Sequence, residues 1–223
     1  MHGPLQEFDG IKQKSYYKFV FEEKIMVNLQ EYLENKVREV IANWGDDDIY
    51  AISFFVYSNK DYEYRGYMNV TEFSVGYNTE RDCGGAPEIS EERWNYAFWS
   101  QNNTYIIEAN DENEGMKLLF DWYGEKRIDN IGYEDEENCY DKDMVYIGKG
   151  PVGYYELLSE IAAVAKKLQE SGFIKNKFGA PLPIIIHDLE YPWYIMEATR
   201  EANSNGEAEP FLRTMRELGI LQE

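Results

Sequence analysis

The chain has 223 residues, of which 43% are hydrophobic and 16% aromatic, and its formal net charge at pH 7 is −20. The length suits one sizeable core, and the hydrophobic content excludes an intrinsically disordered chain. A surface this acidic repels nucleic acid, anionic lipid and free nucleotides and attracts basic proteins. We therefore expect a protein partner and neither a nucleic-acid nor a membrane partner.

Hydrophobic periodicity and turn residues predict the elements along the chain. In chain order these are a loose polar leader over 1–17, a helix over 18–43, a buried strand over 46–57, a hairpin loop over 58–65, a strand over 66–77 with an irregularity near Thr71, a loop over 78–87, a short aromatic helix after the N-cap Ser90, a strand over 104–108, a helix over 110–129, a helix over 151–169, a strand over 181–187, and two C-terminal helices separated around 203–206.

Local chemistry underlies the clearest of these predictions. The segment Asp46–Tyr57 has three acids followed by an almost wholly aromatic and aliphatic run, which is typical of a buried strand. Three successive isoleucines, Ile184–Ile186, form a β-branched run of the same kind. The order of helices and strands predicts one α+β domain over 18–223, with helices packed on a mostly antiparallel sheet.

Targeting and redox signals favour a cytoplasmic protein. No stretch reaches the ~18 apolar residues needed to span a bilayer, and residues 1–15 lack the apolar core of a secretion signal. The two cysteines, Cys83 and Cys139, are too few for a disulfide framework and are not in metal-ligand spacing. We expect reduced thiols, no metal and no cofactor.

Two motifs leave an enzymatic alternative open. Residues 148–153 form a G-x-G-x-x-G turn that precedes a predicted helix, as in nucleotide-binding proteins. However, Pro151 removes a backbone donor, and no acid follows at the expected spacing, so a plain turn is favoured. His187 and Asp188 follow a predicted strand, where α/β enzymes often place catalytic groups. His187 is the only histidine outside the leader, and neither cysteine lies in recognisable spacing from it, so a structural role is favoured for both residues.

Three other segments are better explained by structure than by chemistry. The acids of Asp46–Asp48 precede their strand, whereas a magnesium site would have them after it. Asn110–Gly115 matches a calcium loop poorly. The aromatic segment Arg93–Trp99 is expected to pack in the core or, as a second alternative, to form an interface rim.

Three segments together resemble a bacterial family known only as a domain of unknown function. They are Asp48–Ala51, the aromatic segment Arg93–Trp99, and Pro183–Glu190. The order of elements is similar from about Val37 to Leu221, which is nearly the whole chain. Members of that family are similar in context to immunity proteins that accompany polymorphic toxins. The resemblance implies binding without a cofactor, and it supplies no site residues.

The leading hypothesis is a non-enzymatic acidic binding protein, namely an immunity protein that neutralises a basic toxin domain. The candidate binding residues are acids in two loops: Glu134, Asp135, Glu136, Glu137, Asp141 and Asp143, and Asp111, Glu112 and Glu114. The alternative is a hydrolase or nucleotide-binding enzyme that uses His187, Asp188 and the turn at Gly148–Gly153. A third hypothesis, a subunit of a larger assembly, predicts a broad exposed patch of aromatic side chains.

Overall fold

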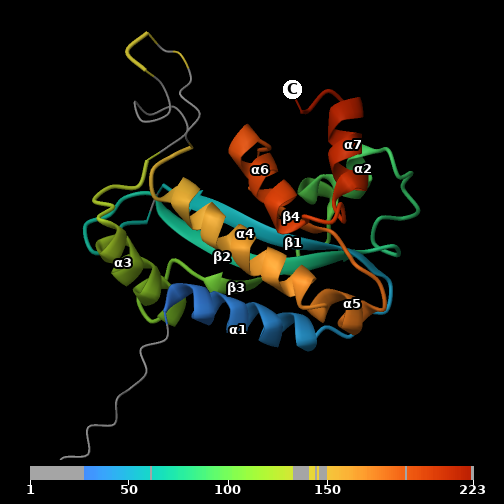
Figure 1. The fold of residues 1–223 in the computed structure, drawn as a ribbon, viewed down its shortest axis with the longest axis horizontal. Helices are drawn as coiled ribbons and strands as arrows, with labels where there is room; N and C mark the ends of the chain where they lie inside the picture. Colours follow the sequence, from blue (N-terminus) through green and yellow to red (C-terminus); the bar gives the residue numbers. More distant parts are fainter. Residues whose placement is uncertain are drawn as a thin grey trace, which may run out of the picture.

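A sheet with the strand order β3-β2-β1-β4 forms the centre of the computed structural model, which describes residues 28–60, 62–132, 141–143, 145, 150–188 and 190–221 (Figure 1). Strands β1 (Ile49–Asn59), β2 (Val70–Thr79) and β3 (Thr104–Ile107) pair antiparallel, and β4 (Ile184–His187) pairs parallel to β1. The expected single α+β domain with a mostly antiparallel sheet is confirmed.

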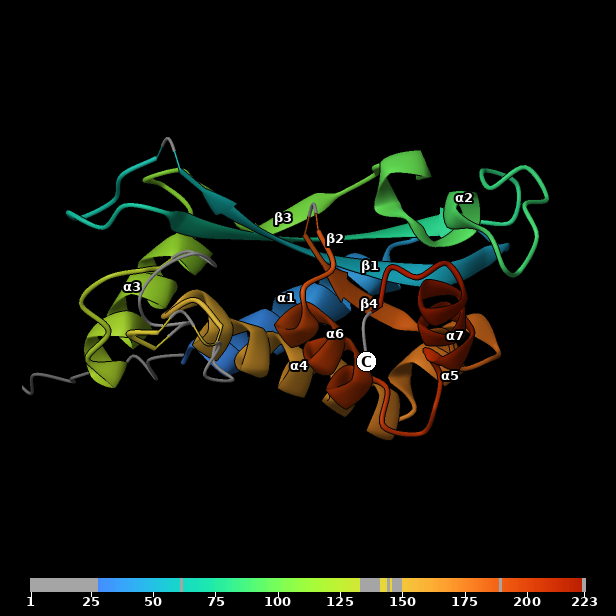
Figure 2. The ribbon, with the colours of Figure 1, turned by 90° about the horizontal axis from the view of Figure 1, so that it is seen from above.

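The helices pack mainly on one side of this sheet. Figure 2 shows α1, α3, α4 and α6 on one side, whereas α2 lies on the other. The bounds are α1 Leu29–Ala42, α2 Glu91–Trp94, the 3₁₀ helix η1 Tyr96–Phe98, α3 Glu114–Lys126, α4 Tyr154–Glu170, α5 Phe173–Phe178, α6 Trp193–Ala202 and α7 Glu209–Glu217. None of the described helices is long and apolar enough to cross a membrane.

Side-chain alternation along β1 divides the core into two clusters. Ile52, Phe54 and Val56 point toward the helices and join the larger cluster. Neighbouring residues point to the opposite face, where Ala51 belongs to a smaller cluster. That cluster also contains Trp94 and Trp99 of the aromatic segment and Phe211 of α7, so the two tryptophans pack in the core, whereas Phe98 of the same segment is 53% exposed.

The outer edge of β4 is covered by side chains of α6. Asn203 accepts from the Ile184 N–H (2.9 Å) and donates to the Ile184 carbonyl (2.7 Å). The Thr199 hydroxyl likewise accepts from the Ile186 N–H and donates to the Ile186 carbonyl. These side chains satisfy backbone groups that a free edge would present to another strand.

The predicted elements are found with shifted ends. The expected N-cap Ser90 accepts from the Arg93 N–H, and the short aromatic segment divides into α2 and η1. An irregularity was predicted near Thr71; Thr71 itself pairs regularly with Ser58, but β2 shifts register against β3 between Phe73 and Ser74. The register of β1 and β2 also shifts between Ile49 and Ala51. Residues 18–27 of the predicted first helix and the leader lie outside the described residues.

Candidate functional site

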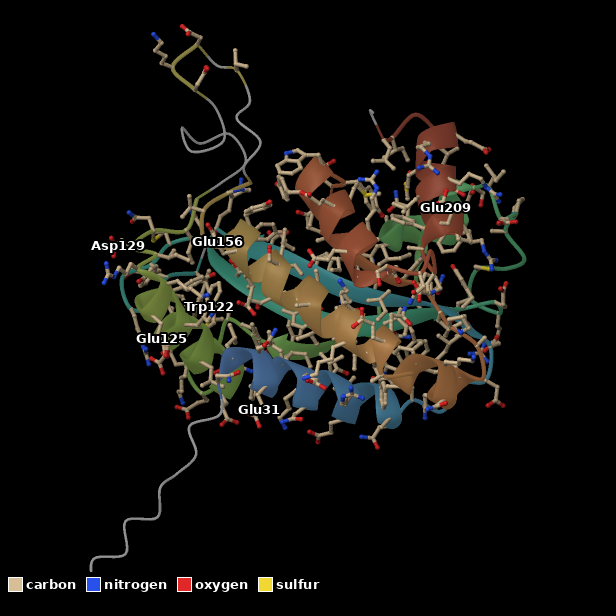
Figure 3. All side chains as sticks on the ribbon, in the orientation of Figure 1. Glu31, Trp122, Glu125, Asp129, Glu156 and Glu209 are labelled. Atoms are coloured by element: carbon tan, nitrogen blue, oxygen red, sulfur yellow. The ribbon has the colours of Figure 1, made fainter. Side chains whose placement is uncertain are left out.

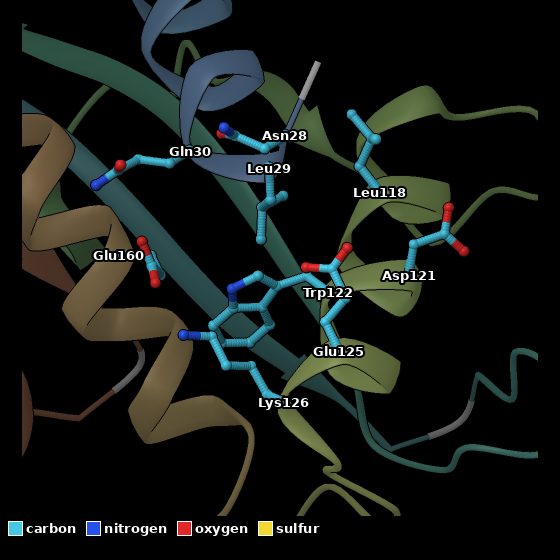
Figure 4. Close-up of a pocket in the computed structure, with 9 residues that line it drawn as sticks. All are labelled: Asn28, Leu29, Gln30, Leu118, Asp121, Trp122, Glu125, Lys126 and Glu160. Atoms are coloured by element: carbon cyan, nitrogen blue, oxygen red, sulfur yellow. The ribbon is translucent and has the colours of Figure 1, made fainter. Parts of the chain in front are cut away.

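A pocket of about 370 Å³ lies between the start of α1, the outer face of α3 and the middle of α4. Its apolar part is formed by Leu29 and Trp122, which belong to the larger core cluster. Figure 4 shows the Trp122 indole directed from α3 toward α4, with Glu160 on the α4 side. The full lining is Asn28, Leu29, Gln30, Leu118, Asp121, Trp122, Glu125, Lys126 and Glu160. We call this hollow the α1–α3–α4 pocket.

Helix capping and helix spacing position these side chains. Asn28 caps α1 by accepting from the Glu31 N–H (2.9 Å). On α3, Asp121 and Glu125 are four residues apart, as are Trp122 and Lys126, so each pair lies along the same side of the helix. Like charges at that spacing destabilise a helix by about 0.2–0.5 kcal/mol. Arg65, at 3.0 Å from Asp121, offsets part of this repulsion.

The charges of the pocket favour a cation. Three of the lining residues, Asp121, Glu125 and Glu160, carry carboxylates, against the single ammonium of Lys126. That ammonium lies 5.6 Å from the centre of the Trp122 ring, within the range of a cation–π contact. The pocket therefore already holds one cation against its aromatic surface. Because Asp121 is paired with Arg65, the carboxylates that remain for another cation are those of Glu125 and Glu160.

A second hollow of about 400 Å³ adjoins this pocket and shares Asn28 and Gln30 with it. Two carboxylates, Glu31 and Glu34, line it, and Glu34 is already paired, because Lys167 and Arg38 both bond to it. The hydrogen bond from Lys167, followed by that from Arg38, lowers the pKa of Glu34 despite partial burial. Glu34 thus contributes less attraction for an external cation than Glu125 and Glu160 of the α1–α3–α4 pocket.

The acidic residues that the sequence predicted as binding residues lie in separate parts of the structure. Asp111, Glu112 and Glu114 are exposed just before and at the start of α3, the helix that carries the pocket residues. Asp141 and Asp143 are exposed, and Asp141 accepts from the Asp143 and Val145 N–H groups. Glu134, Asp135, Glu136 and Glu137 lie outside the described residues.

The pocket residues themselves were missed by sequence reasoning. The available signal was the outward acidic pair Asp121 and Glu125 beside Trp122 on a helix whose other side is apolar. Figure 3 shows Glu31, Glu125, Asp129 and Glu156 around Trp122, at the end of the molecule away from Glu209. Because these acids come from separate segments, a run of charge along the sequence does not reveal them.

His187 is the candidate catalytic residue of the enzymatic alternative. It packs among aromatic side chains on the face of the sheet that carries the smaller core cluster. It is 1% exposed, with the Tyr96 ring centre at 4.6 Å and the Phe55 ring centre at 5.4 Å. Its Nε2 lies 2.7 Å from the Ser53 hydroxyl, and its Nδ1 lies 3.4 Å from the Asp188 carbonyl. Since a carbonyl only accepts, Nδ1 carries the proton and Ser53 donates to Nε2.

This Ser–His contact has the geometry that activates a nucleophile in serine hydrolases, but it lies where no substrate reaches it. Ser53 is 0% exposed, and neither residue lines the α1–α3–α4 pocket or the hollow beside it. Burial lowers the pKa of His187 to about 4, so the ring is neutral at pH 7. Asp188 accepts from the Glu190 N–H and the Tyr154 hydroxyl. These contacts describe a structural histidine and a turn-forming aspartate.

The glycine turn offers no open phosphate site in its described part. Gly148 and Lys149 lie outside the described residues. At the start of α4, the Gly153 N–H donates to the Glu156 carboxylate at 2.5 Å. A phosphate at this helix end would need that position, and it would meet the negative charge of Glu156 there.

The remaining acidic motifs have local partners. Asp46 accepts from the Tyr77 hydroxyl and from Arg81, which also donates its backbone N–H to Asp48. Asn113, in the segment weighed as a calcium loop, caps α3 instead. In the part of the chain that the structure describes, no group of three or more His, Cys, Asp or Glu side chains could hold a metal ion.

Comparisons with known proteins add no relative, because no family model, no curated protein and no solved structure matches the chain.

Proposed function

We propose that the protein is a non-enzymatic acidic binding protein that neutralises a basic protein partner, as an immunity protein neutralises a basic toxin domain. The observation that carries the proposal is the α1–α3–α4 pocket, which combines an indole surface with the carboxylates of Asp121, Glu125 and Glu160. A lysine or arginine of the partner would fit this chemistry. The resemblance of three segments to a family with immunity-protein context supports the same function.

The proposed binding has a long-range and a short-range component. The net charge of −20 attracts a basic partner and speeds encounter, an effect that salt screens over about 10 Å at 0.1 M. Asp111, Glu112 and Glu114 add exposed charge at the start of α3. On contact, the partner's cation enters the pocket, where an aromatic face contributes about 0.5–1 kcal/mol when exposed and about 2 kcal/mol when desolvated.

Lys126 provides a sharp test, because it occupies the cation position against Trp122. Lys126→Gln removes a like charge that the incoming cation must displace, so it is expected to tighten binding. Glu125→Gln and Glu160→Gln each remove an attractive charge and are expected to weaken binding by about two- to fivefold. Glu217→Gln at the exposed end of α7 removes the same charge elsewhere and serves as the matched control.

The measurement is the affinity for the product of the adjacent gene in low salt, by calorimetry, together with inhibition of any activity of that product. The proposal expects binding, opposite effects of Lys126→Gln and the two glutamate variants, and little effect of Glu217→Gln. An absence of binding in low salt overturns the function. Binding that responds equally to Glu217→Gln and Glu125→Gln overturns the role of the pocket.

A further inference from the structure

The face of the sheet opposite the main helix layer is only partly covered. Trp94, Trp99 and Phe211 pack over one end of it. Beyond α2 and the adjoining η1, Figure 2 shows no described helix over the rest of this face. Four rings lie there: Phe55 and Tyr57 on β1, Tyr96 on η1, and Tyr105 on β3. We call these four rings the open aromatic face.

The rings form an ordered surface. Tyr57 and Phe55 are nearly parallel, with ring centres 6.1 Å apart at 7°, and Phe55 stacks on Tyr96 at 4.9 Å and 14°. Ser74 is the register partner of both Phe55 and Tyr105, so Tyr105 lies two strands across from Phe55 on the same face. Tyr105 is 48% exposed. The face therefore offers flat π surface to a partner.

The charges beside these rings are carboxylates. Glu72 pairs in register with Tyr57, and Glu108 follows β3 directly. Burial, followed by the charges of Glu72 and Glu108, raises the pKa of Tyr105. Glu72 is held in place, because it accepts from the Ala109 N–H (2.8 Å) and from the Asn59 amide (3.3 Å). A cation above Tyr105 or Tyr57 would thus meet both π density and a positioned carboxylate.

Two polar atoms beneath the rings lack hydrogen-bond partners among the described residues. They are the hydroxyl of Ser74, a residue that is 0% exposed, and the Oδ1 atom of Asn103. The amide nitrogen of Asn103 donates to the Tyr96 hydroxyl at 2.6 Å, which places this side chain at the edge of the open aromatic face. Both atoms are buried, so a ligand on this face would contact the rings and the carboxylates and not these two atoms.

We propose that the open aromatic face is a second interaction surface, which takes arginine side chains from an extended basic segment of a protein. A guanidinium is planar and stacks on aromatic rings while its five N–H donors reach carboxylates, whereas an ammonium does not stack. A second copy of this chain would bring another charge of −20, and a single-stranded nucleic acid would bring phosphates, so both are electrostatically disfavoured. The inference holds whatever the α1–α3–α4 pocket binds.

The test compares two short peptides of equal charge, one alternating arginine with serine and the other alternating lysine with serine, on the full chain by calorimetry. The arginine peptide is expected to bind at least about threefold more tightly. Tyr57→Ala and Tyr105→Ala should each abolish this preference, because they remove the stacking surface. Leu218→Ala, which truncates an exposed side chain after α7, should preserve it. Glu125→Gln in the pocket should also preserve it, which separates this inference from the proposed function.

Circular dichroism checks that each variant is folded. If Tyr57→Ala does not fold, Tyr105→Ala still tests the proposal, because the Tyr105 side chain is 48% exposed and its truncation removes less core packing. Equal affinities for the two peptides overturn the proposal. So does an arginine preference that survives Tyr105→Ala. Tight binding of a single-stranded oligonucleotide at this face overturns it in favour of nucleic acid, and dimerisation of the free chain that Tyr105→Ala abolishes overturns it in favour of a second copy.

Discussion

His187 shows how one buried residue makes the stability of this protein depend on pH. Burial lowers its pKa from 6.5 to about 4 in the folded chain. Between these values the unfolded chain binds a proton that the folded chain does not. The stabilisation is therefore fully present above pH 6.5 and is lost as the pH falls toward 4. At about 1.4 kcal/mol per pH unit, the loss amounts to about 3 kcal/mol.

Replacing His187 should flatten this pH dependence. In His187→Gln the side chain does not titrate, but it keeps an amide that can bond Ser53. We expect a free energy of unfolding about 1–3 kcal/mol below that of the unmodified chain at pH 7, from imperfect packing. Its decrease between pH 7 and pH 5 should be smaller by about 2 kcal/mol. Urea unfolding at both pH values measures this difference. If the free energy of unfolding decreases equally in the two proteins, His187 is not the source of the pH dependence.

At the scale of elements, α6 protects the sheet from pairing with another chain. Asn203 meets both backbone groups of Ile184, accepts from Gln169 and donates to the Thr199 carbonyl, and it is nearly fully buried. Its carboxamide thus replaces the backbone of a fifth strand at the edge of β4. The β4 strand is short, and its β-branched residues would otherwise form an exposed apolar edge.

Asn203→Ala should strongly destabilise the fold, because it leaves the Ile184 N–H and carbonyl buried without their partner. Each unsatisfied group costs about 1–3 kcal/mol, so we expect a loss of about 2–4 kcal/mol in the free energy of unfolding. Asn205→Ala, two residues away, removes an exposed amide that bonds Glu207, and its expected effect is within about 0.5 kcal/mol. Chemical denaturation of both variants tests the pair, and similar losses would refute a special role for Asn203.

At the scale of the whole molecule, net charge acts on stability and on binding in opposite directions. The chain has 42 acidic residues against 22 basic ones. Many acids in the described part have cationic partners, such as Asp46 with Arg81 and Glu88 with Arg213, but such exposed pairs contribute little. The uncompensated charge repels itself in the compact state, and the same charge attracts a basic partner.

Added salt should therefore stabilise the free protein while it weakens its complexes. Raising the salt concentration to about 0.3 M shortens the screening length to well below 10 Å, which reduces self-repulsion and attraction alike. We expect the thermal midpoint of the free chain to rise by a few degrees and the affinity for the arginine peptide to fall. Calorimetry at two salt concentrations measures both quantities. A midpoint that falls with salt would show that attractive ion pairs outweigh the net charge.

Much of the fold follows from patterns that are local in the sequence. The apolar spacing of Leu29, Leu33 and Val37 predicts the buried side of α1, and Ser90 is the N-cap of α2, as expected from the sequence. The run Ile184–Ile186 is a buried strand. In contrast, α5 spans six residues and lacks a clear period, so it was not predicted. The parallel pairing of β4 with β1 joins residues far apart in the chain, which local pattern does not encode.

The sequence by itself determined that the chain is acidic, and it located most of the helices, strands and helix caps. Such elements depend on residues that are only a few positions apart in the chain. Only the tertiary structure decided what those elements bring together. Packing of both α3 and α4 against α1 places Trp122 and Glu125 in one pocket with Glu160, and strand pairing buries His187 against Ser53, 134 residues earlier. It also leaves one face of the sheet partly uncovered, with the rings of the open aromatic face on it. Such contacts arise because the whole chain buries its apolar surface together, so the sequence of one segment does not reveal them.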